Sequence, residues 1–174
     1  MQFNHYGPVA ARYAAALANA PSTTAGYQAV VDQFVRPVER VDPASAPEIA
    51  EWSNRLRAVF LDRRLDHRVR MVNDLLEVAI RCPFVSTHDG LAPHLHYAQV
   101  EDDLPSRLRA RTAAGLAHVL CDGDHQRLGS CARDGCDIVY MDTSRNGRRR
   151  FCTLRCANRV RVAQHRSRLK AAAG

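Results

Sequence analysis

The sequence CARDGCDIVYMDTSRNGRRRFCTLRC, residues 131–156, decides the fold of the C-terminal part of this chain. It contains two close cysteine pairs, Cys131 with Cys136 and Cys152 with Cys156, spaced C-x4-C and C-x3-C. Pairs spaced in this way suit a tetrahedral Zn²⁺ held by four thiolates. We therefore expect one structural zinc ion at these cysteines, with no open coordination position for catalysis.

The residues around and between the two pairs predict a knuckle, a β-hairpin and a helix. Gly135 gives the backbone freedom to turn, so that the first two sulfur atoms converge. Ile138–Met141 is rich in strand-forming side chains, Asn146-Gly147 is a hairpin-turn dipeptide, and Arg148–Cys152 is the expected returning strand. Thr153 is expected to cap the helix that follows. This order of elements is typical of a treble-clef-like or ribbon-like zinc module.

Basic charge is concentrated around and after the second cysteine pair. The chain has a formal net charge of +7, and residues 1–120 contain equal numbers of basic and acidic side chains, so the excess lies in residues 121–174. Residues 145–170 contain ten Lys or Arg and no Asp or Glu. Charge of one sign at this density indicates a polyanionic partner, which we expect to be DNA. A solvated basic face without a partner is the simpler alternative.

The expected contacts to nucleic acid come from the Arg-rich strand and the helix. At about 100° per residue, Arg155, Arg159 and Arg166 share one helix face, and Arg161 and Arg168 share a second. Most of these side chains would contact phosphates. The asparagine and the arginine that follow Cys156-Ala157 can also read adenine and guanine, or brace the zinc loops through backbone carbonyls. The predicted nucleic-acid-binding residues are Arg149, Arg150, Arg155, Asn158, Arg159, Arg161, Arg166 and Arg168.

Residues 131–168 resemble the CGNR zinc finger family. The matching features are Asp142 after the first strand, Ser144-Arg145-Asn146 in the turn, Arg149-Arg150-Phe151-Cys152, and Cys156-Ala157-Asn158-Arg159 at the helix start. Ala157 replaces the glycine of the motif, and Phe151 stands where tryptophan is more usual. The resemblance implies a bacterial stress-induced transcription regulator, with a DNA-binding finger preceded by the domain that usually accompanies it.

The first 120 residues predict a mainly helical domain. Apolar side chains recur every three or four residues between breaks at Pro and Gly. The expected helices are 7–18, 25–35, 46–61, 65–80 and 105–120, and short strands are expected at 84–86 and 94–99. The predicted fold class is therefore a mainly α N-terminal domain, residues 1–123, with a small C-terminal α+β zinc finger, residues 128–170. The N-terminal domain would serve regulation or dimerisation.

Two histidines in the N-terminal part form a weaker pattern. His94 and His96 would lie on one face of a strand and, with His88 and Asp89, could bind a second metal ion. Because two histidines without an assured third ligand are common on protein surfaces, we interpret them as surface polar residues.

The chain is expected to be cytoplasmic. Arg12 interrupts the apolar residues 9–18 and no Lys or Arg precedes them, which does not fit a secretory signal. The longest uncharged run, residues 13–31, contains Pro21 and Gly26 and would not span a bilayer. In the cytoplasm thiols stay reduced, which favours metal over disulfides. The two remaining cysteines, Cys82 and Cys121, are expected to pack as small half-buried residues.

The expected partners follow from these features. They are DNA, a second copy of the chain in a homodimer, and an unknown small-molecule effector of the N-terminal domain, with no membrane. Nucleotide-binding and hydrolase motifs are absent from the sequence, so no enzymatic activity is expected. The alternative function is a zinc-dependent interaction module that binds an acidic protein or RNA.

Overall fold

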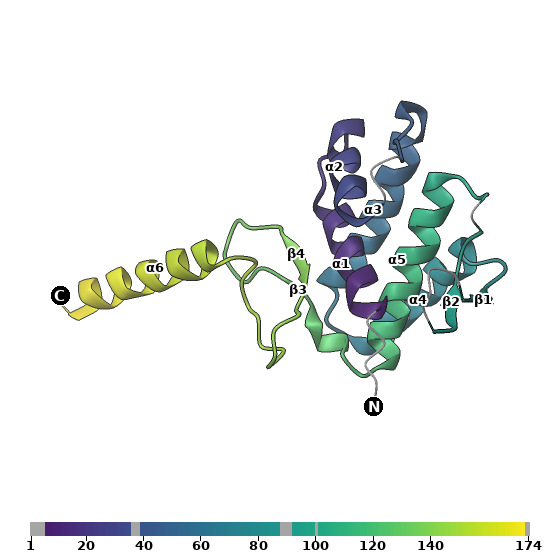
Figure 1. Ribbon diagram of the computed structural model, residues 1–174. Coiled ribbons are helices and arrows are strands. Elements are labelled where there is room, and N and C mark those ends of the chain that lie inside the picture. Colours follow the sequence, from purple (N-terminus) through teal and green to yellow (C-terminus); the bar gives the residue numbers. More distant parts are fainter. Residues whose placement is uncertain (1–5, 36–38, 88–91, 100, 173–174) are drawn as a thin grey trace.

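A bundle of five helices forms the N-terminal part of the computed structural model, which describes residues 6–35, 39–87, 92–99 and 101–172. Helix α1 packs against α3 and α5, and α4 packs against α5 (Figure 1). Each helix begins and ends within one residue of the range predicted from the sequence. The helices are α1 (Tyr6–Asn19), α2 (Thr24–Phe34), α3 (Ala46–Leu61), α4 (Leu65–Ala79) and α5 (Leu104–Cys121).

Side-chain caps explain where several helices begin. The Thr23 hydroxyl accepts a hydrogen bond from a backbone N–H in the first turn of α2, and Asp103 does the same for α5. These bonds satisfy N–H groups that have no partner inside the helix. Ser45, the residue just before α3, makes no such bond. Asp42 instead caps the short 3₁₀ helix η1 (Pro43–Ser45) that leads into α3.

The bundle is held together by close packing of small and aromatic side chains. Gly115 of α5 lies against α1, where an added Cβ would overlap Ala10. The contact between these two helices therefore depends on glycine. Trp52 of α3 is buried and donates a hydrogen bond from its indole N–H to the Thr112 hydroxyl of α5, at 2.9 Å. Burial of an aromatic side chain of this size contributes a few kcal/mol, on the order of 1.5–3, to folding.

A small hairpin joins α4 to α5. Strands β1 (Phe84–Ser86) and β2 (His94–His96) pair antiparallel, with Phe84 opposite His96. This agrees with the predicted strands, although the second is shorter than expected. The turn residues His88 and Asp89, which the weaker metal hypothesis invoked, lie outside the described residues.

The second hairpin differs from the one predicted. After the short 3₁₀ helix η3 (His125–Arg127), β3 (Leu128–Ser130) pairs antiparallel with β4 (Val139–Met141). The expected return strand, Arg148–Cys152, is not a strand in the structure, so that prediction was wrong. The knuckle residues connect the two strands that do pair. When β4 pairs with β3, Val139 and Met141 pack into the helical bundle, and this packing accounts for why β4 pairs with β3.

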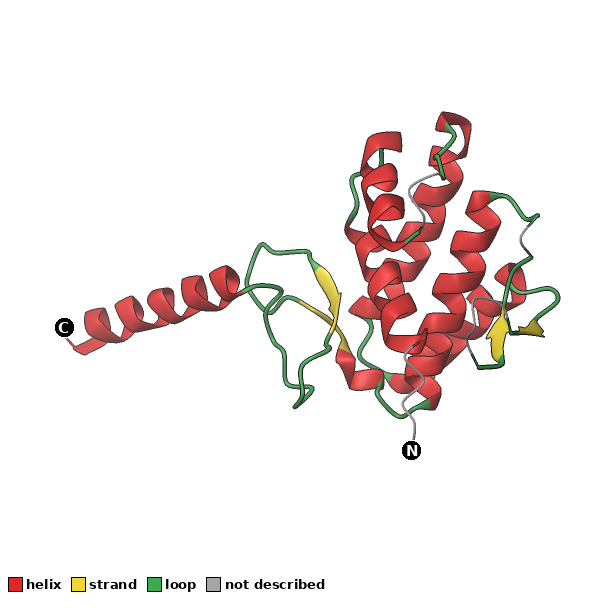
Figure 2. Cartoon of the chain, viewed as in Figure 1, coloured by secondary structure: helices red, strands yellow, loops and turns green. Residues whose placement is uncertain are grey.

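Strand β4 lies between two cores. Val139 and Met141 belong to the same buried cluster as the helices, together with Leu128 of β3. Tyr140, which points to the opposite face as strand geometry requires, packs against the cysteine cluster. The strands therefore connect the bundle to the C-terminal helix, as the yellow arrows in Figure 2 show.

The edge of β4 is closed by a side chain from α1. The Asn19 side-chain amide donates to the Val139 carbonyl at 2.8 Å and accepts from the Val139 N–H at 3.0 Å. One asparagine thus replaces a neighbouring strand and fixes the hairpin to the bundle. The division into domains 1–123 and 128–170 stays a prediction, but the two parts share buried side chains.

The fold class is confirmed: a mainly helical N-terminal part carries a small α+β module with the cysteine cluster. In the part of the chain that the structure describes, none of the helices has the length and apolar character needed to cross a bilayer.

Candidate metal centre

A tight turn brings the first cysteine pair together. Gly135 has φ +69°, a left-handed conformation that side chains disfavour, as the sequence predicted for this position. The Cys136 N–H donates to the Arg133 carbonyl at 3.1 Å and closes the turn. The Cys131 N–H donates to the Ile138 carbonyl at 2.9 Å, at the end of the β3–β4 pairing. Both sulfur atoms of the pair therefore face the same space.

The second pair lies at the start of helix α6 (Leu154–Ala172). The Thr153 hydroxyl accepts a hydrogen bond from the Cys156 N–H at 3.2 Å, so the predicted cap is confirmed. Cys156 thus occupies the first helical turn, and Cys152 lies just before it. The positive end of the helix dipole favours negative charge on these two sulfur atoms.

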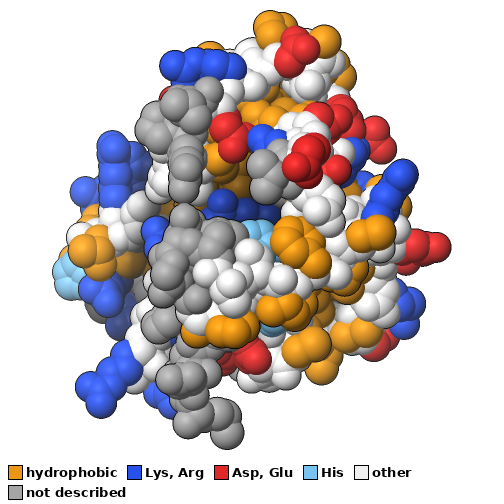
Figure 3. All heavy atoms as spheres, turned by 45° about the vertical axis from the view of Figure 1, so that its right-hand side comes forward, with side chains coloured by type: hydrophobic (Ala, Val, Ile, Leu, Met, Phe, Trp, Pro, Cys, Tyr) orange, Lys and Arg blue, Asp and Glu red, His pale blue; other side chains and the backbone are white. Residues whose placement is uncertain are grey.

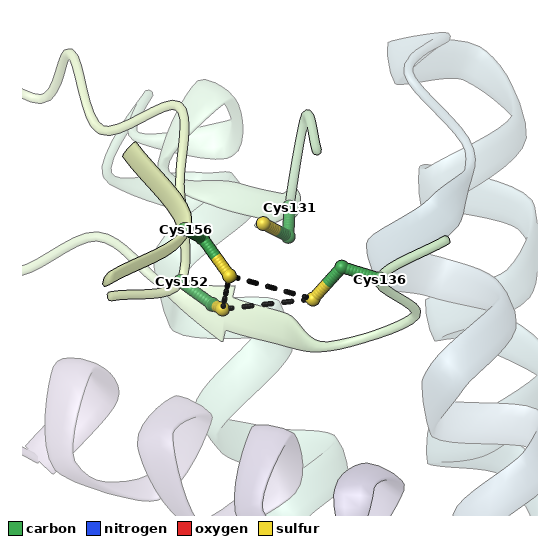
Figure 4. Close-up of side chains that lie close together, drawn as sticks. All are labelled: Cys131, Cys136, Cys152 and Cys156. Carbon is green, nitrogen blue, oxygen red and sulfur yellow. Dashed lines mark hydrogen bonds between the residues drawn. The ribbon is translucent and has the colours of Figure 1, made fainter. Parts of the chain in front are cut away.

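The four sulfur atoms have the spacing of a tetrahedral zinc site. They lie within 4.8 Å of one another, and the Sγ–Sγ distances are 3.5 Å for Cys152–Cys156, 3.7 Å for Cys136–Cys152 and 3.9 Å for Cys136–Cys156. A tetrahedron with Zn–S bonds of about 2.3 Å has edges of about 3.8 Å. Figure 4 shows the four side chains converging from the knuckle and the start of α6. The residues fit one structural zinc ion with all four positions filled.

The charge around the sulfur atoms is tuned by their neighbours. Arg133, inside the knuckle, donates from Nε to the Cys156 sulfur at 3.3 Å, and this bond lowers the pKa of that thiol to about 6. A hydrogen bond from the Ile138 backbone lowers the pKa of Cys136, whereas burial raises the pKa of Cys152 to about 12. Because zinc binds thiolates, metal binding releases the protons that remain on these thiols and weakens as the pH falls.

Asp142 organises the turn between the two pairs. Its side chain is only 2% exposed, and its carboxylate accepts hydrogen bonds from the backbone N–H groups of Ser144 and Arg149, both at 2.8 Å. Burial raises the pKa of Asp142, but the hydrogen bonds from Ser144 and Arg149 outweigh it, so the pKa lies below its ordinary value. The segment that follows is therefore held by a side chain rather than by strand pairing.

Replacing Asp142 with asparagine is expected to loosen this turn. An amide oxygen can accept in place of one carboxylate oxygen, but the amide NH₂ faces the second N–H and leaves it unsatisfied. Loss of such a bond costs about 1–3 kcal/mol, so amide hydrogen exchange at Ser144 or Arg149 should accelerate roughly tenfold or more. Asp134→Asn, at an exposed knuckle position, is the matched control. Equal exchange rates in both variants would contradict this role.

The basic helix projects from the rest of the molecule. In Figure 1, α6 points away from the bundle and carries the C-terminal end of the chain. Every side chain from Arg161 to Leu169 is exposed, and the 19-residue helix contains no Asp or Glu. One shallow groove along it is lined by Arg155, Asn158, Arg159, Val162, Ala163 and Arg166. The structure thus brings the predicted residues of the first helix face together.

Arg149 and Arg150, which precede the second cysteine pair, do not lie on the helix as the other predicted arginines do. Arg149 donates to the backbone carbonyls of Phe151 and Cys152, and its guanidinium lies 4.4 Å from the centre of the Tyr140 ring. The Tyr140 hydroxyl donates to the Arg149 carbonyl at 2.6 Å. Arg149 is exposed, but these contacts place it across the segment before Cys152, where it braces the module. The exposed Arg150 lies over the half-buried Phe151, with its guanidinium 5.7 Å from the ring centre.

Sequence reasoning missed Arg133 as a neighbour of the sulfur atoms. Its only signal was its place between the two cysteines of the knuckle, from which a guanidinium can reach the sulfur atoms. The weaker histidine pattern gives a close pair, with ring nitrogen atoms of His94 and His96 3.0 Å apart. Among the described residues, the four cysteines are the one group of three or more metal-binding side chains that meet. Cys82 and Cys121 are exposed, not half-buried as predicted.

Comparison with known proteins agrees with this site. Residues 127–169 match the family model of the CGNR zinc finger, and no curated protein matches the chain. The match begins just before β3 and ends within α6, so it includes both strands and all four cysteines. The C-terminal module of this chain is a CGNR zinc finger, as the resemblance indicated.

Proposed function

We propose that this protein is a transcription regulator that binds duplex DNA through α6 of its zinc finger. The observation that carries the proposal is the form of α6. The helix projects from the molecule, is exposed at every side chain from Arg161 to Leu169, carries basic side chains without acidic ones, and is fixed at its N-terminal end by the cysteine cluster. Zinc would give this helix a fixed direction that an isolated basic segment lacks.

The dimensions of α6 suit the major groove. A helix of 19 residues is about 28 Å long and, with side chains, about 10–12 Å wide. The major groove is about 12 Å wide and admits a helix. Arg161, Arg166 and Arg168 would contact phosphates on either side, together with Arg155 and Arg150.

Asn158 and Arg159 are proposed to read bases. The sequence left two roles open for them, base contacts or bracing of the zinc loops. Both side chains are exposed, and neither forms a hydrogen bond or ion pair with any residue that the structure describes. This supports the first role, since asparagine pairs with adenine and arginine with guanine in the major groove.

The proposed function also includes a location, a non-catalytic role for the metal and a role for the helical part. The protein acts in the cytoplasm, where reducing conditions keep four cysteines available for metal. It has no catalytic activity, because four thiolates leave zinc without an open position. The helical part serves regulation or dimerisation. The alternative, a module that binds an acidic protein or RNA, uses the same basic helix.

DNA binding is tested by fluorescence anisotropy with the zinc-loaded protein. Affinity for a random-sequence duplex should fall steeply with salt, with a logarithmic slope of about −0.9 per phosphate neutralised. Arg166→Ala and Arg168→Ala should weaken binding to all sequences about equally and reduce this slope by about one each. Arg70→Ala, on the exposed face of α4, is the matched control and should bind as the unchanged protein does.

Base reading is tested separately after selection of a preferred duplex. Arg159→Ala should lose preference for that duplex while retaining zinc, at a cost of about 1–3 kcal/mol for one bidentate base contact. Loss of zinc in Arg159→Ala would instead show a bracing role. Binding to duplex DNA no stronger than to double-stranded RNA or polyglutamate would favour the interaction module over the regulator.

A further inference from the structure

A cavity of about 420 Å³ lies in the helical part, between α1, the end of α2, the residues of β2 and α5. A volume of this size is typical of sites for small organic molecules. Apolar side chains, among them Leu104 and Leu108, form much of its wall. Figure 3 shows the face formed by this side of the molecule, where blue and pale-blue side chains lie in a hollow beside hydrophobic ones.

A buried tyrosine hydroxyl in this cavity has no partner. Tyr13 of α1 is 0% exposed, and its ring stacks on Phe34 with centroids 4.9 Å apart. Its hydroxyl forms no hydrogen bond with any residue that the structure describes. The hydroxyls of Tyr27 and Ser53 share this property, but neither residue lines the cavity. A buried hydroxyl without a partner costs about 1–3 kcal/mol, which a bound acceptor would recover.

The cavity also contains an excess positive charge. Arg107 pairs with Glu39, so these two charges offset each other. Arg111 lies 5.6 Å from the centre of the Tyr13 ring and donates to the Phe34 carbonyl at 3.2 Å. Within the described residues it forms no ion pair. Burial raises the pKa of Tyr13 and the charge of Arg111 opposes this, so the hydroxyl stays a neutral donor close to the guanidinium.

The Arg111 guanidinium and the Tyr13 hydroxyl determine which kind of ligand the cavity can bind. A guanidinium and a neutral hydroxyl are both donors, and together they match the two oxygens of a carboxylate. One unpaired cation balances a single negative charge, whereas a phosphate dianion would leave a charge buried and unpaired. The apolar side chains of the wall suit a hydrocarbon body, because they offer no hydrogen-bonding partner to a polar one.

We propose that the cavity binds a small organic monocarboxylate with an apolar body. Its carboxylate accepts hydrogen bonds from Arg111 and the Tyr13 hydroxyl, and its body contacts Leu104 and Leu108. This site goes beyond the proposed DNA binding and does not depend on it, because none of these residues belongs to the zinc finger.

The test is an NMR titration of the ¹⁵N-labelled, zinc-loaded full chain with benzoate and with hexanoate. At least one acid should shift the amide signals of cavity residues in a saturable way, and the neutral amides benzamide and hexanamide should bind at least about tenfold more weakly, the loss expected for a charge-assisted contact. Arg111→Gln should remove binding. Arg109→Gln, on the same helix but paired with Glu48, should leave it unchanged.

Tyr13→Phe separates a ligand contact from a purely structural side chain. The variant removes the unsatisfied hydroxyl, so its midpoint of thermal unfolding without ligand should equal or exceed that of the unchanged protein. Its affinity for the acid should nevertheless fall about tenfold, as expected when a bond to a charged group is lost. Two results would overturn the proposal: no saturable shift with either acid below about 10 mM, or equal binding of acids and amides.

Discussion

Cys156→Ser should lose its zinc and unfold the finger. A serine hydroxyl stays protonated at neutral pH and does not replace a thiolate, so the zinc content should fall from about one equivalent per chain to near zero. A segment as short as residues 131–170 cannot bury enough apolar surface to fold alone. Structural zinc contributes about 10–16 kcal/mol to modules of this size, which makes this one of the two largest effects expected for a single substitution.

The helical bundle should survive this change in weakened form. Leu128, Val139 and Met141 belong to the buried cluster of the helices, so unfolding of β3 and β4 exposes part of that core. Far-UV circular dichroism should therefore lose the contribution of α6 and retain that of α1–α5, while the midpoint of thermal unfolding falls. Elemental analysis gives the zinc content in the same samples.

Cys121→Ser is the matched control for the metal site. Cys121 is exposed and lies outside the cysteine cluster, so this variant should retain zinc and unfold as the unchanged protein does. A full equivalent of zinc in Cys156→Ser, or a disulfide among the four cysteines of the unchanged protein, would contradict the proposed ligand set.

The helices and the metal ligands could be predicted because their signals are local. Thr23 and Asp103 carry cap side chains just before the helices they start, and Pro105 follows the second of them. The cysteine pairs are only a few residues apart, so their spacing alone limits the geometry that they can adopt. Such features depend on neighbours in the sequence and not on the rest of the fold.

The pairing of β4 could not be predicted because it depends on tertiary contacts. The Asn146-Gly147 dipeptide does form a turn, with Gly147 at φ +60°, but a turn signal does not decide whether the flanking residues pair. Asp142 takes up the Arg149 N–H, which a return strand would have offered to β4. Asn19 meanwhile occupies the edge of β4 from a position 120 residues away.

The cavity of the helical part could not be predicted from the sequence for a similar reason. Tyr13 has the spacing of an ordinary core residue of α1, and Arg111 lies in the middle of α5, where the sequence pattern gives it no special role. Only the packing of α1 on α5 brings the ring and the guanidinium together. The unsatisfied hydroxyl becomes visible once its neighbours are known.

Arg68 is expected to be the most sensitive position outside the zinc site. Its side chain is 2% exposed, and burial lowers its pKa despite the opposing charge of Asp62. The guanidinium donates to backbone carbonyls in the last turn of α3 and just after it, in η3 and in β3, and those in the last turn of α3 belong to the helix end that lacks partners further along the helix. The acceptors are the carbonyls of Val59, Phe60, Asp62, His125 and Leu128.

Arg68→Met should therefore lower the free energy of unfolding by about 3–5 kcal/mol, because it leaves several buried carbonyls without a donor. Urea unfolding followed by the fluorescence of Trp52 measures this change. Arg70→Met, two residues along α4 and exposed, should change stability by no more than about 0.5 kcal/mol. Arg68→Lys should recover only part of the loss, since one ammonium with three donors cannot replace the planar guanidinium.

The zinc content of Arg68→Met shows whether Arg68 stabilises the helical bundle alone or also supports the zinc site. Its bonds to His125 and Leu128 hold the start of the finger against the bundle, but none of its partners is a cysteine. The variant should keep a full equivalent of zinc while its bundle unfolds at lower urea concentration. Loss of zinc along with stability would mean that bundle and finger fold as one unit, and unchanged stability would mean that water replaces the guanidinium at these carbonyls.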